Sequence, residues 1–286
     1  MIFMKKIIAL YNPGRLANQL WLATSLYAYC LEKGYEYNNY VFYPYYNYYG
    51  HRSGNWFIDK ILVKLPSKLG IVVYRVWAQC IRILNKKRIL YDRKKEFLLP
   101  PTDVIEKFCL EELNKVDRTK TDRFYFWGWV FRNPVGLEKY RSEIKKYFWP
   151  IEKYAIQIND CITKAKASGK VLVGVHIRQG DFKTWQGGIY YFSIEEVREI
   201  LDDFLASRKE PHNYIFLICS DEKIDEKVFV GINYIIGPGN LISDLYSLAG
   251  CQVIFGPGGT FSPWAAYYGG VNYIRFSRGL IDWPDL

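Results

Sequence analysis

Three motifs that mark large classes of nucleotide-binding proteins are missing from this chain of 286 residues. The pattern Gly-x-Gly-x-x-Gly does not follow the first apolar segment, which argues against a nicotinamide- or flavin-dependent dehydrogenase. No Gly-x-x-x-x-Gly-Lys-Ser/Thr segment occurs, which argues against a P-loop kinase. No Asp-x-Asp pair occurs that could hold a divalent ion on a diphosphate. If the chain acts on a diphosphate, arginine and the amides at helix starts would have to neutralise its charge.

Long hydrophobic runs and paired cysteines are also missing. No window approaches the roughly 18 apolar residues that suggest a membrane-spanning helix. The N-terminal segment MIFMKKIIALYNPG has too short an apolar stretch for a signal peptide and no small-residue cleavage site. The cysteines form no Cys-x-x-Cys pair and have no histidine at metal-ligand spacing. We therefore expect a reducing, cytoplasmic setting. The scattered cysteines are Cys30, Cys80, Cys109, Cys161, Cys219 and Cys251.

The composition indicates a folded chain with a substantial core. Half of the residues are apolar, and the length fits two domains of roughly 130–150 residues or one large domain. Aromatic residues make up 18% of the chain. Such residues suit sugar-binding surfaces, but we expect most of them to fill the core.

The net charge of +10 is concentrated in one stretch. Between Lys60 and Tyr91 the chain has basic residues and no acidic one, interleaved with Ile, Leu, Val and Trp77. This pattern fits a segment that lies on an anionic membrane surface. It also fits an ordinary amphipathic helix with a solvated basic face, which we favour. No nucleic-acid recognition module accompanies the charge, so we expect no nucleic acid as a partner. The basic residues are Lys60, Lys64, Lys68, Arg75, Arg82, Lys86, Lys87 and Arg88.

The first half of the chain opens with a strand, a glycine-containing turn and a helix. Residues 6–11 predict a buried strand, and residues 15–33 have apolar side chains at helical spacing, with Gly34 as the stop. This is the opening unit of a doubly wound sheet, and the turn would attract an anion. In residues 35–55 the many tyrosines could stack on a sugar, but we favour an irregular connection that packs on its own aromatic rings. Residues 124–131 predict a strand or strand pair.

Regular alternation of strand and helix signals marks the second half of the chain. A capping box, Ser193 with Glu196, opens a predicted helix over residues 193–207. Such alternation predicts a parallel sheet with crossover helices. Residues 140–167 predict a helical stretch with a turn at Pro150. We place the domain boundary near residues 150–168 and divide the chain into residues 1–160 and 161–286. The other predicted strands are 213–219, 233–236, 252–255 and 273–276, and the other helices are 240–249 and 260–268.

Polar clusters follow three of the predicted strands, at residues 14–19, 176–181 and 256–262. The second cluster ends the segment VLVGVHIRQGDF, in which a buried strand turns abruptly polar. Open α/β sheets place ligands at such strand ends, and the guanidinium fork of Arg178 matches two phosphate oxygens at once. Arg178 could instead be solvated or paired with Asp181. In the third cluster Gly258 and Gly259 would let the backbone approach an anion, or would form a tight turn capped by Thr260.

The order of these clusters resembles the bacterial alpha-1,2-fucosyltransferases and the related protein O-fucosyltransferases. Residues 14–19 (GRLANQ) are similar to the GxxxNQ and GRxxNQ of these enzymes, and residues 176–182 (HIRQGDF) to their HxRRGDY/F. Residues 219–222 (CSDE) stand at their FSDD-like strand end, residues 244–251 (DLYSLAGC) resemble D-L-x-x-M-S-x-C, and residues 260–264 (TFSPW) resemble SFSWW. The resemblance covers residues 5–34 and about 170–277.

The resemblance implies a GT-B fold, with two Rossmann-like domains facing across a cleft. It implies an N-terminal acceptor-side domain over residues 1–160 and a C-terminal nucleotide-sugar donor domain over residues 161–286. The implied enzyme is an inverting glycosyltransferase that needs no metal or other cofactor. It would move L-fucose from GDP-fucose to a hydroxyl, with the galactose 2-hydroxyl of a glycan or lipid-linked oligosaccharide as the expected acceptor. We expect a role in cell-surface polysaccharide biosynthesis, at the cytoplasmic side of the inner membrane.

The resemblance also assigns roles to single residues. Arg178 would contact the donor diphosphate and stabilise the leaving GDP, with Asp181 as the nearest carboxylate for a catalytic or a structural role. Asp244 would bind the guanine edge. The other residues assigned to the donor are Arg15, Asn18, His176, Gly259, Thr260, Phe261 and Ser262.

Three positions depart from the family pattern. Gln179 stands in place of the second arginine of HxRR, Gly258 in place of an asparagine, and Pro263 in place of a tryptophan. Two alternatives therefore stay open, namely the same fold with another nucleotide sugar, or a non-catalytic protein that binds GDP or a glycan.

Overall fold

The computed structural model describes residues 4–12, 14–92, 113–114, 116, 121–128 and 131–284, with residues 91 and 92 described by their backbone alone. The chain divides into two compact units, Met1–Trp149 and Pro150–Leu286. Each unit contains one sheet in which every described strand pair is parallel. The α/β class with two parallel sheets is therefore confirmed. Cys109 and residues 129–130 of the predicted strand at 124–131 lie outside the described residues.

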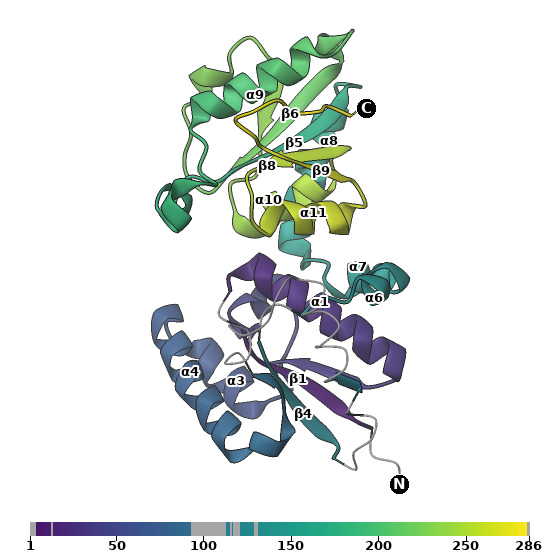
Figure 1. Ribbon diagram of the computed structural model, residues 1–286, viewed down its shortest axis with the longest axis vertical. Coiled ribbons are helices and arrows are strands. Elements are labelled where there is room, and N and C mark those ends of the chain that lie inside the picture. Colours follow the sequence, from purple (N-terminus) through teal and green to yellow (C-terminus); the bar gives the residue numbers. More distant parts are fainter. Residues whose placement is uncertain are drawn as a thin grey trace. The chain divides into compact units, whose positions relative to one another are not determined.

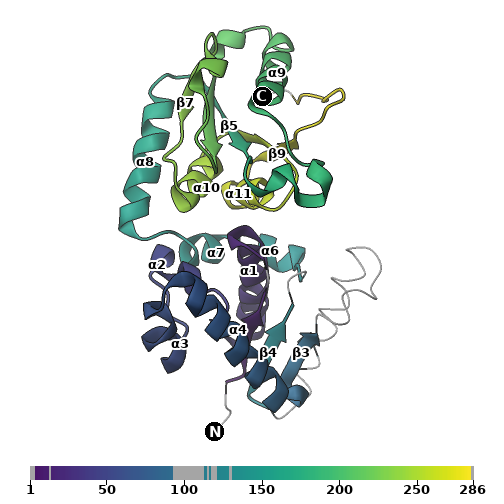
Figure 2. The ribbon, with the colours of Figure 1, turned by 90° about the vertical axis from the view of Figure 1, so that its left-hand side faces the viewer.

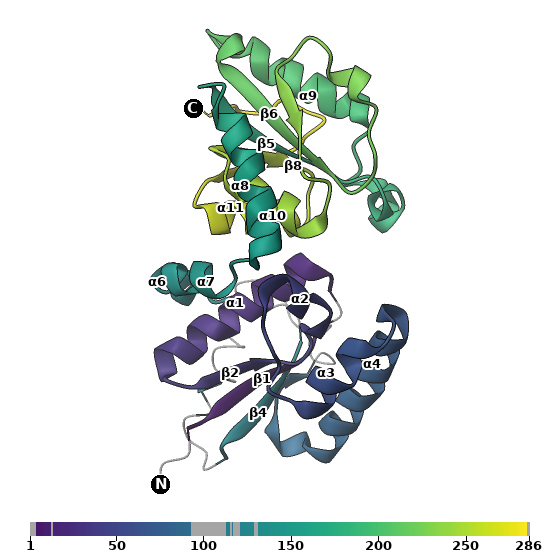
Figure 3. The ribbon, with the colours of Figure 1, turned by 180° about the vertical axis from the view of Figure 1, so that it is seen from behind.

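The sheet of the first unit has the order β2-β1-β4-β3. The predicted opening unit is confirmed, because β1 (Lys6–Tyr11) is followed by α1 (Leu16–Lys33). Gly34 ends α1 with a φ of 65°, a left-handed conformation that glycine adopts without strain. Helix α1 lies on one side of the sheet, and α3 and α4 lie on the other (Figure 1, Figure 3). The remaining strands are β2 (Glu36–Asn39), β3 (Ile89–Asp92) and β4 (Arg123–Trp127).

The tyrosine-rich stretch from residue 35 to residue 55 is more regular than predicted. It supplies the edge strand β2 and two short helical turns, so the prediction of an irregular connection is wrong for these residues. The prediction that it packs on its own aromatic rings is confirmed, because Tyr46 and Tyr49 are buried against Phe42. The helical elements of this unit are η1 (Tyr43–Tyr45), α2 (Tyr46–Tyr49), α3 (Trp56–Lys60), η2 (Leu62–Lys64), α4 (Ser67–Leu84), η3 (Lys86–Arg88), α6 (Pro134–Lys139) and α7 (Arg141–Tyr147).

The sheet of the second unit has the order β7-β6-β5-β8-β9. From β5 the chain moves outward through β6 and β7, and then returns to the other side of β5 as β8 and β9. The strand order therefore reverses between β5 and β8, and open α/β sheets bind ligands at the carboxyl ends of strands beside such a point. The strands are β5 (Val171–Ile177), β6 (Tyr214–Ser220), β7 (Tyr234–Ile236), β8 (Val253–Gly256) and β9 (Asn272–Arg275).

Helices cover both faces of this second sheet (Figure 2). Helix α9 (Ile194–Ala206) lies on one face and starts with the predicted capping box, which is confirmed. Helices α8 (Glu152–Lys166), α10 (Leu241–Ala249) and α11 (Phe261–Gly269) lie on the other face, and α10 packs against both α8 and α11. The short helical turns are η6 (Asp181–Lys183), η7 (Trp185–Gly188), η8 (Pro211–Asn213) and η9 (Glu226–Phe229).

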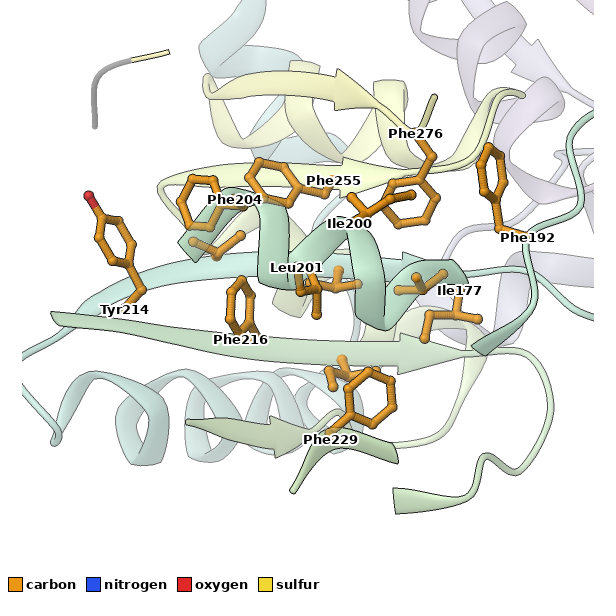
Figure 4. Close-up of a cluster of buried hydrophobic side chains, with 14 of the residues drawn as sticks. Ile177, Phe192, Ile200, Leu201, Phe204, Tyr214, Phe216, Phe229, Phe255 and Phe276 are labelled. Atoms are coloured by element: carbon orange, nitrogen blue, oxygen red, sulfur yellow. The ribbon is translucent and has the colours of Figure 1, made fainter. Parts of the chain in front are cut away.

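The core beneath α9 fixes the direction of the β5 side chains. Phe204 and Leu201 of α9 pack with Phe216 and Phe255 from the strands (Figure 4). Val173, Val175 and Ile177 belong to the same cluster. Because side chains alternate along a strand, His176 points to the opposite face, where α10 and α11 lie. This alternation places an ionisable ring beside α11.

No helix among the described residues is both long and apolar enough to cross a membrane. The five cysteines that the structure describes are free thiols. Three of them, Cys30, Cys219 and Cys251, are buried, and burial raises the pKa of each thiol above its ordinary value.

Candidate active site

A pocket with a volume of about 170 Å³ opens at the carboxyl ends of β5 and β6. Its wall combines two strand ends, the start of α10 and the start of α11. Four residues assigned to the site from the sequence line it, namely His176, Arg178, Asp244 and Phe261. The other lining residues are Cys219, Ser220, Asp221, Gly239, Asn240 and Leu241.

The guanidinium of Arg178 lies between two carboxylates. Its Nε and Nη2 donate to Oδ1 of Asp181 over 3.0 and 2.7 Å. Its Nη1 lies 3.3 Å from Oδ2 of Asp221. The pairing with Asp181 that the sequence left open is therefore present, and it coexists with a place on the pocket wall. Only 17% of the Arg178 side chain is exposed, so its direction is set by these partners.

Asp221 connects the arginine to the backbone of the next residue. Its Oδ1 accepts the N–H of Gln179 over 2.7 Å, while its Oδ2 faces Arg178. The Gln179 side chain is buried and donates through Nε2 to the Phe192 carbonyl over 2.8 Å. Gln179 therefore supports the fold behind the pocket, and its amide does not replace the second guanidinium of the family pattern.

His176 is a buried neutral ring. Its Nδ1 lies 2.8 Å from the Ser262 hydroxyl, and its ring packs 4.6 Å from that of Phe261. Burial, together with the positive charge of Arg178, lowers the pKa of His176 to about 3. At neutral pH one ring nitrogen therefore carries a proton that it can donate, and the other can accept a hydrogen bond. Ser262 does not line the pocket and acts on it by holding this ring.

Asp244 supplies a carboxylate at the start of α10. Its Oδ1 accepts the N–H of Gly239 over 2.9 Å. Burial raises the pKa of Asp244 to about 6, and hydrogen bonds from the backbone of Gly239 and Asn240 oppose that rise. Near neutral pH the carboxylate is mostly ionised inside a partly enclosed pocket. A charged acceptor in that position is suited to two adjacent N–H donors of a ligand.

The glycines at 258 and 259 make room for aromatic rings. A Cβ on Gly258 would lie 2.2 Å from Cδ1 of Tyr190, and Gly259 has a φ of 114° with the Phe182 ring beside it. These contacts explain both glycines without a ligand. Thr260 stands at the N-cap position of α11, but its side chain makes no capping hydrogen bond. The predicted capping by the Thr260 side chain is therefore wrong. Binding of an anion at this turn stays a prediction.

Arg15 and Asn18 lie in the first unit, at the start of α1. There, Asn12 Oδ1 accepts the Gly14 N–H over 2.8 Å, and Gln19 Nε2 donates to the Gly14 carbonyl over 3.0 Å. The turn that was predicted to attract an anion is thus braced by neutral amides. The roles of Arg15 and Asn18 toward a donor stay predictions.

Six of the lining residues were not assigned from the sequence, and Asp221 is the charged one among them. It directly follows β6, and β6 pairs with β5 so that Cys219 lies beside His176 and Ser220 beside Ile177. Continuing that register places Asp221 beside Arg178. The sequence did carry a signal for Asp221, because an acidic and a basic residue directly follow two strands that were both predicted. Among the described residues, no group of His, Cys, Asp and Glu side chains could hold a metal ion.

Comparisons with known proteins point to one class of enzyme. The model of the Glycosyl transferase family 11 matches residues 140–279, which include the whole pocket. No curated protein matches the chain.

Several fucosyltransferases are among the solved structures that resemble the chain. The fucosyltransferase NodZ from Bradyrhizobium has a TM-score of 0.51 at 12% identity, covering 92% of this chain and 92% of that chain. A complex of POFUT1 with GDP-fucose has a TM-score of 0.51 at 11% identity, covering 96% and 98%. A variant of Arabidopsis thaliana FUT1 in complex with GDP has a TM-score of 0.53 at 11% identity, covering 97% and 71%. These likenesses show a shared α/β fold of the GT-B type, and a cleft between the two units stays a prediction.

Proposed function

We propose that the protein is an inverting fucosyltransferase that moves L-fucose from GDP-fucose to a hydroxyl group of a glycan. The observation that carries the proposal is Arg178, whose guanidinium lines a pocket at the carboxyl end of the central strand β5. The match to the Glycosyl transferase family 11 over residues 140–279 supports it. The fold shared with fucosyltransferases, among them complexes with GDP and GDP-fucose, supports the choice of donor.

In the proposed reaction Arg178 stabilises the leaving group. The bond between fucose C1 and the diphosphate oxygen breaks, and its electron pair stays on GDP. An acceptor hydroxyl oxygen attacks C1 from the face opposite to the leaving group, which inverts the configuration, and its proton passes to water. A preorganised cation beside the departing phosphate is worth roughly 3–4 kcal/mol, by analogy with single donors to developing oxyanions. On this mechanism the transfer needs no metal ion.

The other pocket residues would hold the donor. Asp244 would accept hydrogen bonds from the guanine edge, and His176 with Phe261 would contact the nucleotide. We assign Asp181 mainly to positioning Arg178, since its Oδ1 accepts hydrogen bonds from both Nε and Nη2 of that guanidinium. Ser262 would orient His176. The remaining donor contacts in the proposal are Arg15, Asn18, Gly259 and Thr260.

We infer that the acceptor is the 2-hydroxyl of a galactose in a glycan or lipid-linked oligosaccharide. A lipid-linked acceptor would place the reaction at the cytoplasmic side of a membrane, in the synthesis of a cell-surface polysaccharide. The basic segment of residues 60–88, with its exposed lysines, favours this choice of acceptor.

Substitution of the arginine tests the proposal. With GDP-fucose as donor, release of GDP should fall at least about 100-fold in both Arg178→Ala and Arg178→Lys, because lysine cannot reproduce the guanidinium fork. Arg198→Lys in α9 is the matched control, since Arg198 forms an ion pair with Asp202 away from the pocket. Near-normal turnover in Arg178→Lys would refute the role of the fork. GDP-mannose and UDP-sugars, assayed in parallel, test the choice of donor.

A protein that binds GDP without turnover is the second candidate. It is favoured by one observation, namely that the three guanidinium nitrogens of Arg178 already face carboxylates. Calorimetric binding of GDP together with no release of GDP from GDP-fucose, with or without glycan acceptors, would support this candidate over the transferase.

A further inference from the structure

Helix α4 of the first unit is anchored along one side. Gly70, Tyr74 and Ala78 are its buried residues, and they recur every four positions. The Tyr74 hydroxyl donates to the Leu10 carbonyl of β1, which ties the helix to the sheet. Trp77 packs against the rings of Tyr40, Phe57 and Tyr74. Because this side faces the sheet, the opposite side of α4 faces outward.

The outward side of α4 carries a row of apolar side chains. Leu69, Val72, Val76 and Ile83 are spaced three, four and seven residues apart, so they share one face of the helix. Each of them is more than half exposed. That face lies opposite the buried side, because residues 72 and 76 fall half a turn from Tyr74. An ordinary surface helix has a polar face here, so this row is unusual for a helix that faces only water.

Only positive charge accompanies the apolar row. Lys68 and Arg75, seven residues apart, are exposed along one flank of the row. The exposed residues Lys86, Lys87 and Arg88 follow the end of the helix. The chain from Lys60 to Tyr91 contains no acidic residue. Arg82 is not part of this charged flank, because its guanidinium lies over the Trp127 ring of β4.

We propose that this outward face of α4 docks onto the surface of an anionic lipid bilayer. Its apolar row would enter the boundary between headgroups and acyl chains, while the lysines and arginine contact lipid phosphates. A second copy of the chain fits less well, since a contact between two such faces would offer the basic flanks no acidic residue from residues 60–91. The inference concerns the first unit and does not depend on the transferase activity of the second.

Co-sedimentation with lipid vesicles tests the docking face. The whole protein should bind vesicles of phosphatidylcholine with about one third phosphatidylglycerol, and bind pure phosphatidylcholine at least about tenfold more weakly. The double variant Val72→Asp/Val76→Asp should lose binding to the anionic vesicles. The double variant Lys68→Gln/Arg75→Gln should bind them about tenfold or more weakly, because each basic residue near an anionic surface contributes about fivefold.

Matched controls come from exposed residues of the second unit. Ile156→Asp/Val230→Asp removes apolar side chains that are as exposed as those of α4, and Lys164→Gln/Lys166→Gln removes two exposed charges of α8. Both controls should bind anionic vesicles like the parent. Unchanged far-ultraviolet circular dichroism and thermal midpoints in every variant show that folding is intact.

Three results would overturn the proposal. The first is a parent protein that does not bind anionic vesicles. The second is an equal loss of binding in the α4 variants and the control variants. The third is a dimer of the parent in solution that Val72→Asp/Val76→Asp converts to a monomer, which would assign the face to a second copy of the chain.

Discussion

The ends of β1 and β5 hold similar turns with different chemical groups. After β1, Asn12 and Gln19 brace the backbone of Gly14 through neutral amides. After β5, Arg178 is held between the carboxylates of Asp181 and Asp221. Both strands are central in parallel sheets, and both lead into the polar segments that the sequence predicts as ligand sites.

On the proposed function, the end of β5 is the one that receives an anion, and the difference in chemical groups supports that choice. A bond between neutral groups that closes on its own backbone contributes about 1 kcal/mol and has no reason to open for a ligand. A carboxylate that faces an arginine at a pocket wall can be exchanged for a phosphate, since both match the same fork. We therefore expect a change of charge at the end of β5 to alter turnover. A charge introduced at the end of β1 should instead lower the free energy of unfolding.

The largest expected effect on stability comes from Asp244, the buried carboxylate of the same pocket. Its pKa is raised by burial to about 6, so ionisation opposes folding, and the stabilisation present near pH 4 is lost as the pH rises through 6. Asp244→Asn keeps an acceptor for Gly239 and removes the charge. Its free energy of unfolding in urea should match the parent near pH 4 and exceed it by roughly 2–3 kcal/mol near pH 8.

The exposed Asp160→Asn in α8 is the control for this pH series, and it should show no such gain at high pH. A difference between Asp244→Asn and the parent that stays constant from low to high pH would mean that the charge of Asp244 is compensated in the folded protein.

A carboxylate placed at the end of β1 should have the next largest effect. Asn12 is buried, and its Nδ2 donates to the Asn18 carbonyl over 3.2 Å. Asn12→Asp keeps the acceptor for Gly14 but turns a carboxylate oxygen toward that carbonyl. The free energy of unfolding should fall by roughly 2 kcal/mol near neutral pH, as expected for a buried polar group without a partner. The exposed Asn159→Asp serves as the control, and an equal loss there would remove the argument.

The reverse exchange at the end of β5 should change turnover more than stability. Asp221→Asn keeps the acceptor for the Gln179 N–H and removes one of the two charges that orient Arg178. On the proposed function, kcat should fall about tenfold, or about 1.4 kcal/mol, with a smaller change in the KM for GDP-fucose. Glu222→Gln is the control, because Glu222 pairs with Lys183 at the surface. Equal losses of kcat in both variants would contradict a positioning role for Asp221.

Local signals in the sequence predicted most of the fold of the second unit. The capping box of Ser193 and Glu196 gave the start of α9, and the glycines and prolines between apolar runs separated the strands. The short edge strand β2 was missed because its residues, Glu-Tyr-Asn-Asn, have little intrinsic preference for a strand. Pairing of its backbone with β1 supplies the order that composition does not.

The position of Arg178 on a pocket wall could be predicted from the sequence. Only one of its two carboxylate partners could be predicted in the same way. Asp181 is close along the chain, whereas Asp221 comes from a different strand and is found only through the register of β5 and β6. Asp244 entered through resemblance alone. The aromatic rings that fill the space over Gly258 and Gly259 depend on the path of the chain after β5, which no local pattern specifies.

The central strands also have a consequence for how the chain acquires its structure during synthesis. In each sheet the first strand to be made is an inner one, and it gains one of its two neighbours only much later, as in the pairings of Lys6 with Arg123 and of Val173 with Val253. Contacts between such distant residues close slowly, and until they form, a strand rich in apolar side chains has an open edge. Nascent chains that stall between β1 and β4, or between β5 and β8, should therefore be the species that aggregate and that require chaperones.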